Sequence, residues 1–192
     1  MDQIRAFIAV ELSSEIKQVL ERVQSRLKSR SRASAKWVEP GSIHLTLKFL
    51  GNIDTGMVSK IDKALENAVN GLGPFELGLS GLGVFPGSGR VRVVWIGLGG
   101  EVERLNHLQN RVESELQTLG LSTEARGFSP HLALARVRDN ATPAERQELG
   151  KLIGEIKPDF TDMMTVDAIK LIKSQLTPTG PIYTTLSTIE FK

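Results

Sequence analysis

One short pattern, His-Leu-x-Leu, occurs twice in this chain and constrains its fold more than any other feature. The first copy lies in "SIHLTLKFLG" (residues 42–51) and the second in "FSPHLALARV" (residues 128–137). Their histidines, His44 and His131, are 87 positions apart (131 − 44), and the whole chain has only three histidines. A single histidine in a strand is usually a packed, chemically idle residue. Two in matching contexts indicate an internal duplication that carries a function.

The same offset relates the segments on either side of the motif. Stretches rich in β-branched and aromatic residues predict strands, and apolar residues at helical spacing predict helices. The expected strands are 4–10, 76–84, 91–97, 163–171 and the closing strand 182–191, besides the two motif strands; the expected helices are 13–29, 56–70, 101–119 and 142–156. The unit β-α-β-α-β therefore occurs twice. This pattern predicts an α+β fold with two pseudo-symmetric lobes, each an antiparallel-type sheet backed by helices, facing each other across a central cleft.

Length and composition fit one domain over residues 1–192, made of two related lobes with an internal repeat offset of 87 residues. The absence of cysteine excludes a disulfide framework, a Cys-ligated zinc and a thiol nucleophile, and fits a reducing compartment. The short apolar stretch near the N-terminus is interrupted by Arg5, so we expect neither a signal peptide nor a membrane span. We predict a cytoplasmic protein without a membrane partner, and a monomer.

Residues 22–36 hold six Lys or Arg and no acid, although the net charge of the chain is only +2. Two interpretations remain open for this basic stretch. It is either the solvated end of a helix with its loop, or an electrostatic footprint for a partner that carries phosphate.

The motif itself predicts a pair of chemical groups on one face of a strand. Because residues i and i+2 of a strand share a face, His44 and Thr46 point together, and Leu45 and Leu47 point to the core. An imidazole that moves a proton then lies beside a hydroxyl that can bind an anionic oxygen.

Two such pairs related by a two-fold axis suit a phosphodiester. One neutral imidazole can take a proton from the nucleophile while the opposite imidazolium gives one to the leaving oxygen. The sequence favours no metal at this site, because it contains no HExxH motif and no Cys, His, Asp or Glu run at ligand spacing.

The blocks "RAFIAV", "HLTLKFLG", "GVFP", "RVVW", "FSPHLALAR" and "LTPTGPIYTTL" occur in this order along the chain. With these blocks the sequence resembles the two-histidine (2H) phosphoesterases, specifically the bacterial and archaeal RNA 2′,3′-cyclic phosphodiesterases once called 2′-5′ RNA ligases. The resemblance implies hydrolysis of a 2′,3′-cyclic phosphate at an RNA end, or in a cyclic nucleotide, to a 2′-phosphomonoester. It also implies that His44 is the proton donor and His131 the proton acceptor, and that no cofactor is needed.

The resemblance further suggests that Thr46, Arg136 and Tyr183 surround the phosphate or the nucleoside. Arg136 and Phe49 each follow a motif histidine by five residues, and strict alternation would turn both away from the cleft. They can reach the substrate only through a β-bulge or at a strand end. With that geometry, Arg136 can bind phosphate and Phe49 can stack on a base; otherwise Phe49 is a core residue. Tyr183 is interpreted either as a base or ribose contact or as a packing residue.

The second motif departs from the family pattern, because Ala133 occupies the position of a threonine. A methyl group cannot donate a hydrogen bond, so Arg136 or a backbone N–H must replace that donor in an active enzyme. Arg92 is a candidate contact for the RNA backbone. We expect Arg90 and the third histidine, His107, to be exposed to solvent.

Two other functions remain open at this point. One is ATP-independent 2′-5′ RNA ligation, in which a ribose 5′-hydroxyl replaces water and the same chemistry runs backwards. The other is a non-catalytic RNA-end binding protein, which the replacement of the motif threonine by Ala133 makes conceivable.

Overall fold

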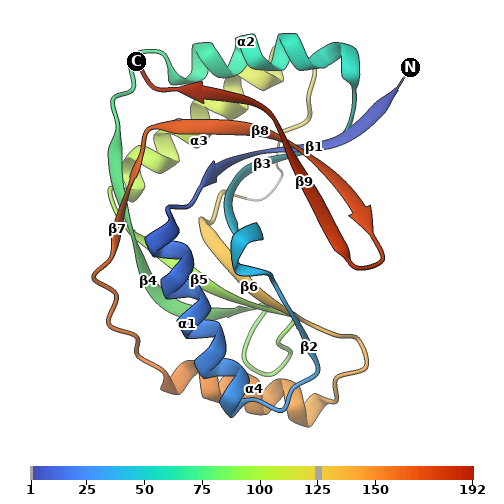
Figure 1. The fold of residues 1–192 in the computed structure, drawn as a ribbon, viewed down its shortest axis with the longest axis vertical. Coiled ribbons are helices and arrows are strands. Elements are labelled where there is room, and N and C mark those ends of the chain that lie inside the picture. The colour runs from blue at the N-terminus through green and yellow to red at the C-terminus, as the bar shows by residue number, and fades with distance from the viewer. Residues whose placement is uncertain (1, 124–126) are drawn as a thin grey trace.

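The computed structural model, which describes residues 2–123 and 127–192, contains two antiparallel β-sheets (Figure 1). The four-stranded sheet has the order β3 (His44–Asp54), β1 (Gln3–Glu11), β8 (Ala168–Thr177) and β9 (Gly180–Glu190). The five-stranded sheet has the order β2 (Ala35–Trp37), β6 (His131–Val137), β5 (Val93–Gly100), β4 (Phe75–Phe85) and β7 (Met163–Val166). The expected α+β class with two antiparallel sheets is therefore confirmed.

The expected helices form within a few residues of their predicted bounds: α1 (Ser14–Arg30), α2 (Val58–Val69), α3 (Val102–Gln117) and α4 (Pro143–Glu155). Ser13 caps α1 by accepting a hydrogen bond from the N–H of Ile16. Thr142 and Glu145 form a capping box at the start of α4, ahead of its first-turn proline. No helix in the described part of the chain is long and apolar enough to cross a membrane.

The two halves of the sequence exchange elements, so that neither sheet is built from one half alone. Strand β4 belongs to the first half but pairs with β5 and β7, whereas β8 belongs to the second half but pairs with β1. In Figure 1, α2 and α3 lie together against the four-stranded sheet, and α1 and α4 lie at the five-stranded sheet. The largest set of buried apolar side chains runs through both sheets and all four helices as one core.

The structure departs from the sequence prediction at three strands. The segment 163–171 is two strands, β7 and β8, which separate at Asp167 and join different sheets. The strand expected at 91–97 begins at Val93, and the short strand β2 was not predicted. His107 and Arg90 are exposed, as expected.

A buried ion pair joins β3 to α3. The side chain of Lys48 is only 2% exposed, and its Nζ donates to the Glu113 carboxylate (2.8 Å) and to the carbonyl oxygen of Ser122 (2.8 Å). The carboxylate also accepts from the buried Gln109 amide (3.2 Å). Because burial removes both charges from water, each needs its partner.

Replacement of Glu113 by alanine should therefore destabilise the fold by about 3 kcal/mol, because it leaves the Lys48 ammonium buried without a carboxylate. Urea denaturation followed by circular dichroism measures this change. The matched control is Glu66→Ala, which removes the exposed Lys63–Glu66 pair on α2 and should leave the midpoint almost unchanged. Equal effects of the two substitutions would contradict the prediction.

Candidate active site

The first motif strand, β3, contains a β-bulge just after its histidine. Along β1, Ala9 lies opposite Thr46 and the next residue, Ile8, lies opposite Lys48, so Leu47 is the extra residue in β3. Leu47 and Lys48 are both buried, which breaks the alternation of inward and outward side chains.

The second motif strand, β6, has the same irregularity at the equivalent position. Along β5, Val94 lies opposite Ala135 and Trp95 opposite Ala133, so Leu134 is the extra residue. Leu134 and Ala135 are both fully buried. Both bulges thus fall three residues after a motif histidine.

The bulges decide which side chains lie with the histidines. We call the sheet face that carries the motif histidine the site face. The register places His44, Thr46 and Phe49 on the site face of the four-stranded sheet. It places His131, Ala133 and Arg136 on that of the five-stranded sheet. Phe49 and Arg136, each five residues after a motif histidine, need a bulge to reach the site face, and both strands contain one. The two motif strands, β3 and β6, also contact each other.

A buried glutamine holds the bulge of β6. Gln24 of α1 is completely buried, and its Nε2 donates to the carbonyl oxygens of Leu134 (2.9 Å) and Val38 (2.7 Å). The N–H of Val38 also donates to the Leu134 carbonyl (2.9 Å). The carbonyl oxygen of the bulged residue Leu134 therefore accepts from two donors, one on each of two neighbouring segments.

The two motif imidazoles are anchored in the same way. Nδ1 of His44 lies 2.9 Å from the carbonyl oxygen of Ser42, and Nδ1 of His131 lies 2.7 Å from that of Ser129. A carbonyl oxygen only accepts, so Nδ1 carries a proton in both rings. Nε2 is then the nitrogen that exchanges a proton in each imidazole.

Aromatic rings support each imidazole. The His44 ring stacks on Phe7 (centroids 4.6 Å apart) and meets Tyr183 edge-on (5.2 Å). The His131 ring meets Phe85 (5.1 Å) and Trp95 (6.3 Å) at steep angles. These contacts fix the ring planes through packing as well as through hydrogen bonds.

Burial lowers the pKa of His44 below its ordinary value, because the charged imidazolium loses hydration. The Ser42 carbonyl opposes this shift, and the nearby Lys17 ammonium adds to it. Burial also raises the pKa of the Tyr183 hydroxyl, and the positive charges of Arg136 and Arg5 act against that change. Arg136 on β6 is therefore near enough to Tyr183 on β9 for its charge to affect the pKa of that hydroxyl, although the two strands belong to different sheets.

The remaining predicted site residues differ in their placement. The Phe49 side chain is exposed (56%) rather than part of the core, and Arg136 is also exposed. Ala133 lies opposite Trp95 and is partly exposed. Arg92 is exposed just before β5, where its carbonyl oxygen accepts from the N–H of Val137. Among the described residues, the Arg92 side chain forms no hydrogen bond or ion pair, so its role stays a prediction.

Sequence reasoning missed several residues of the site. Phe7 packs with Ala9 and Ile172 in a small cluster on the site face, apart from the main core. The alternation of "RAFIAV" carries this signal, since Arg5, Phe7 and Ala9 share one face of β1. Trp95 lies opposite Ala133 in the register and so shares the face of His131. Gln24, in contrast, leaves no local signal.

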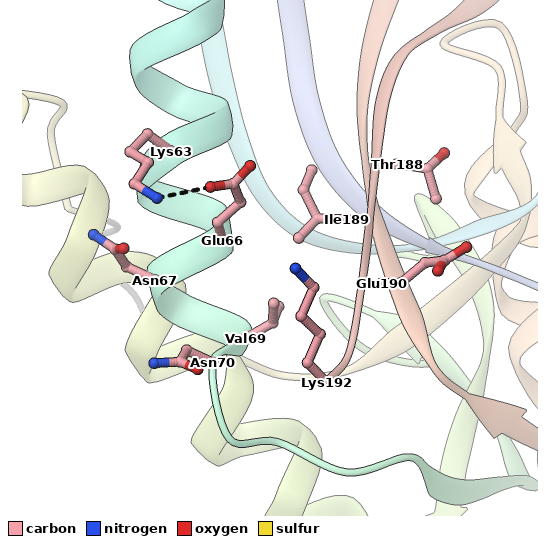
Figure 2. A pocket seen from close by; sticks show the side chains of 9 residues that line it. All are labelled: Lys63, Glu66, Asn67, Val69, Asn70, Thr188, Ile189, Glu190 and Lys192. Atoms are coloured by element: carbon pink, nitrogen blue, oxygen red, sulfur yellow. Dashed lines mark hydrogen bonds and ion pairs between the residues drawn. The ribbon is translucent and has the colours of Figure 1, made fainter.

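A pocket of about 210 Å³ adjoins His44 on the site face of the four-stranded sheet; we call it the His44 pocket. Figure 2 shows a larger pocket, about 510 Å³, between α2 and β9, where Lys63 and Glu66 form an ion pair. None of the predicted site residues lines the larger pocket. In the part of the chain that the structure describes, no group of three or more His, Cys, Asp or Glu residues is placed to hold a metal ion.

A family model described as LigT-like phosphoesterase matches the chain twice, over residues 10–95 and 96–183. The chain belongs to the LigT-like phosphoesterase family. It is 38% identical over 182 residues to a protein of Methanothermobacter thermautotrophicus named RNA 2′,3′-cyclic phosphodiesterase, covering 95% of this chain and 96% of the relative. A Thermotoga maritima protein of the same name is 35% identical over 190 residues, covering 98% of this chain and 96% of the relative.

Two solved structures share the fold of this chain. A protein of Thermus thermophilus superposes with a TM-score of 0.80 at 26% identity, covering 98% of both chains. E. coli LigT in its complex with 3′-AMP gives a TM-score of 0.76 at 23% identity, covering 100% of this chain and 99% of that one. The two-sheet architecture around the paired histidine motifs is thus that of the LigT-like fold.

We expect Gly83→Ala to disturb the surroundings of His131. A Cβ at Gly83 would collide with the Trp95 indole, which lies flat over this glycine and close to the imidazole. Displacement of a supporting ring should lower turnover roughly tenfold or more and change the tryptophan fluorescence. The control is Gly81→Ala on the same strand, where a Cβ meets nothing within 4 Å. Wild-type turnover in a folded Gly83→Ala variant would contradict this role of Trp95.

Proposed function

We propose that this protein hydrolyses RNA 2′,3′-cyclic phosphodiester ends to 2′-phosphomonoesters by metal-independent general acid–base catalysis. In this mechanism His131 accepts a proton from the attacking water and His44 donates a proton to the leaving 3′-oxygen. The bond between phosphorus and the 3′-oxygen breaks as the bond to the water oxygen forms. The substrate is RNA with a cyclic phosphate end or a 2′,3′-cyclic nucleotide, and relatives with this name support the assignment.

The observation that carries the proposal is the matched anchoring of the two imidazoles. Each Nδ1 is held by a carbonyl two residues earlier in the chain, which leaves each Nε2 available on the site face. Acid–base catalysis on one phosphate needs one neutral proton acceptor and one protonated donor. The contact between β3 and β6 supports placing both imidazoles on the same substrate.

Oxyanion binding in this proposal is asymmetric. On β3 the hydroxyl of Thr46 is the donor beside His44, whereas the methyl of Ala133 beside His131 donates nothing. Arg136 compensates for this loss, because the bulge at Leu134 turns its guanidinium to the same face, and a guanidinium binds phosphate oxygens with two parallel hydrogen bonds. Tyr183 and the exposed Phe49 provide ring faces for the nucleoside.

Incubation with 2′,3′-cyclic AMP in EDTA tests the activity directly, and the expected product is 2′-AMP. His44→Ala and His131→Ala should each abolish turnover while retaining the fold, because the leucine faces of both strands stay intact. Turnover above a small fraction of the wild-type rate in either variant would exclude the two-histidine mechanism. Tight binding of cyclic-phosphate RNA without product would instead identify an RNA-end binding protein, and joining to 5′-hydroxyl RNA would identify a ligase.

The pH dependence of kcat/KM should be bell-shaped, because one imidazole must be neutral and the other charged. The two limbs belong to the coupled pair of imidazoles. Because burial lowers the pKa of His44, the acidic limb of kcat/KM, which reports the lower of the two pKa values, should lie below the ordinary imidazole value of about 6.5. Both limbs of kcat should lie at higher pH than the corresponding limbs of kcat/KM, because the bound phosphate anion favours the charged imidazolium. Steady-state rates with 2′,3′-cyclic AMP across pH give both profiles. Limbs of kcat at or below those of kcat/KM would contradict binding of the phosphate anion beside the two imidazoles.

A further inference from the structure

Two lysines from distant parts of the chain converge beside His44. Lys17 comes from the first turn of α1 and Lys170 from β8, and both line the His44 pocket. Their side chains are only 23% and 24% exposed, although lysines on protein surfaces are usually well solvated. The surrounding residues therefore hold both ammonium groups at the wall of this pocket.

A single carboxylate faces both ammonium groups. Glu11, the last residue of β1, forms a hydrogen-bonded ion pair with Lys170, and its other oxygen lies 3.6 Å from the Nζ of Lys17. The Lys170 ammonium keeps the pKa of the Glu11 carboxyl below its ordinary value. Two positive charges against one negative charge leave the pocket with a net positive charge, before any charge on His44 is counted.

The proposed mechanism places the substrate ribose at this pocket. His44 donates to the 3′-oxygen of the terminal ribose, so the rest of that nucleoside extends over the four-stranded sheet. Phe7 lies opposite Phe49 in the register and Glu11 lies opposite His44, and these two residues of β1 are about 14 Å apart along the strand. Aromatic rings therefore line one part of the site face and cationic groups another.

We propose that the His44 pocket is a second anion site, which binds the phosphodiester linking the terminal nucleotide to the rest of the RNA through Lys17 and Lys170. This inference rests on the function proposed above and makes the site selective for RNA ends over free cyclic nucleotides. A cyclic mononucleotide has no such phosphodiester. The hydroxyl of Thr185 in the same pocket is a further donor to its oxygens.

Substrate pairs that differ only in this phosphodiester test the site. We would compare kcat/KM for a trinucleotide ending in adenosine 2′,3′-cyclic phosphate with kcat/KM for 2′,3′-cyclic AMP. Lys17→Gln and Lys170→Gln should each lower the ratio of the two values about tenfold, because each removes a charge-assisted hydrogen bond that only the RNA makes. The matched control is Lys60→Gln on α2, an exposed lysine that does not line the His44 pocket, which should keep the wild-type ratio.

The salt dependence of the unmodified protein gives a test that needs no variant. For the trinucleotide, log KM should rise with log salt concentration more steeply than for the mononucleotide, by a slope of about 0.7 for each additional phosphate contacted. An unchanged substrate ratio in both folded lysine variants would overturn the site and reduce the three residues to an ion-pair cluster that joins β1, α1 and β8. Equal salt slopes for the two substrates would do the same.

Failure of the proposed function is distinguishable from failure of this site. If the protein hydrolyses neither substrate, the proposed function is wrong. Equilibrium binding of the trinucleotide then still decides the site, since Lys17→Gln and Lys170→Gln should each weaken it about tenfold and Lys60→Gln should not. Equal affinities in all four proteins would exclude the site.

Discussion

The paired β-bulge, one extra residue three positions after each motif histidine, is the constraint on which the site depends. In a regular strand Arg136 and Phe49 would face away from the histidines that precede them. The bulges at Leu134 and Leu47 bury two consecutive residues and return the next side chain to the site face. A strand without its bulge would keep its histidine on the site face but would turn the side chain five residues later away from the site. A shift of one residue moves every later side chain to the other face of the sheet.

Long-range polar contacts explain why both bulges persist. Gln24 lies in the first half of the chain yet donates to Leu134 in the second, and Glu113 lies in the second half yet pairs with Lys48 beside the first bulge. Each motif strand is thus fixed by a helix from the other half. The exchange of helices and strands between the sheets ties the two imidazoles to one continuous core, which preorganises them relative to each other.

The sequence predicts the parts of this architecture that arise from local patterns. Helix ends follow from caps such as Ser13 and Thr142, and the buried leucines of the motifs follow from alternation. From the sequence, a bulge could be stated only as a condition for Arg136 and Phe49 to reach the site. The contact between Gln24 and the bulged residue Leu134 joins residues 110 positions apart, and no local pattern reveals it. The split at Asp167 was missed because apolar residues continue on both sides of it, although the buried positions change phase there, from Met164 and Val166 to Ile169 and Leu171. The Glu11–Lys170 contact spans 159 positions, which no local pattern encodes.

Symmetric anchoring combined with asymmetric surroundings supports the different proton-transfer roles proposed for the two histidines. Their Nδ1–carbonyl contacts match, yet His44 lies among Phe7, Tyr183 and a lysine-lined pocket, whereas His131 lies against Phe85 and Trp95. Burial favours the neutral form of His44 in the free protein, although the proposed donor must be charged. An anionic substrate reverses this preference, because its negative charge stabilises the imidazolium. In the proposed mechanism, binding of the phosphate thus favours charging of the acid and offsets the cost of desolvating its imidazolium.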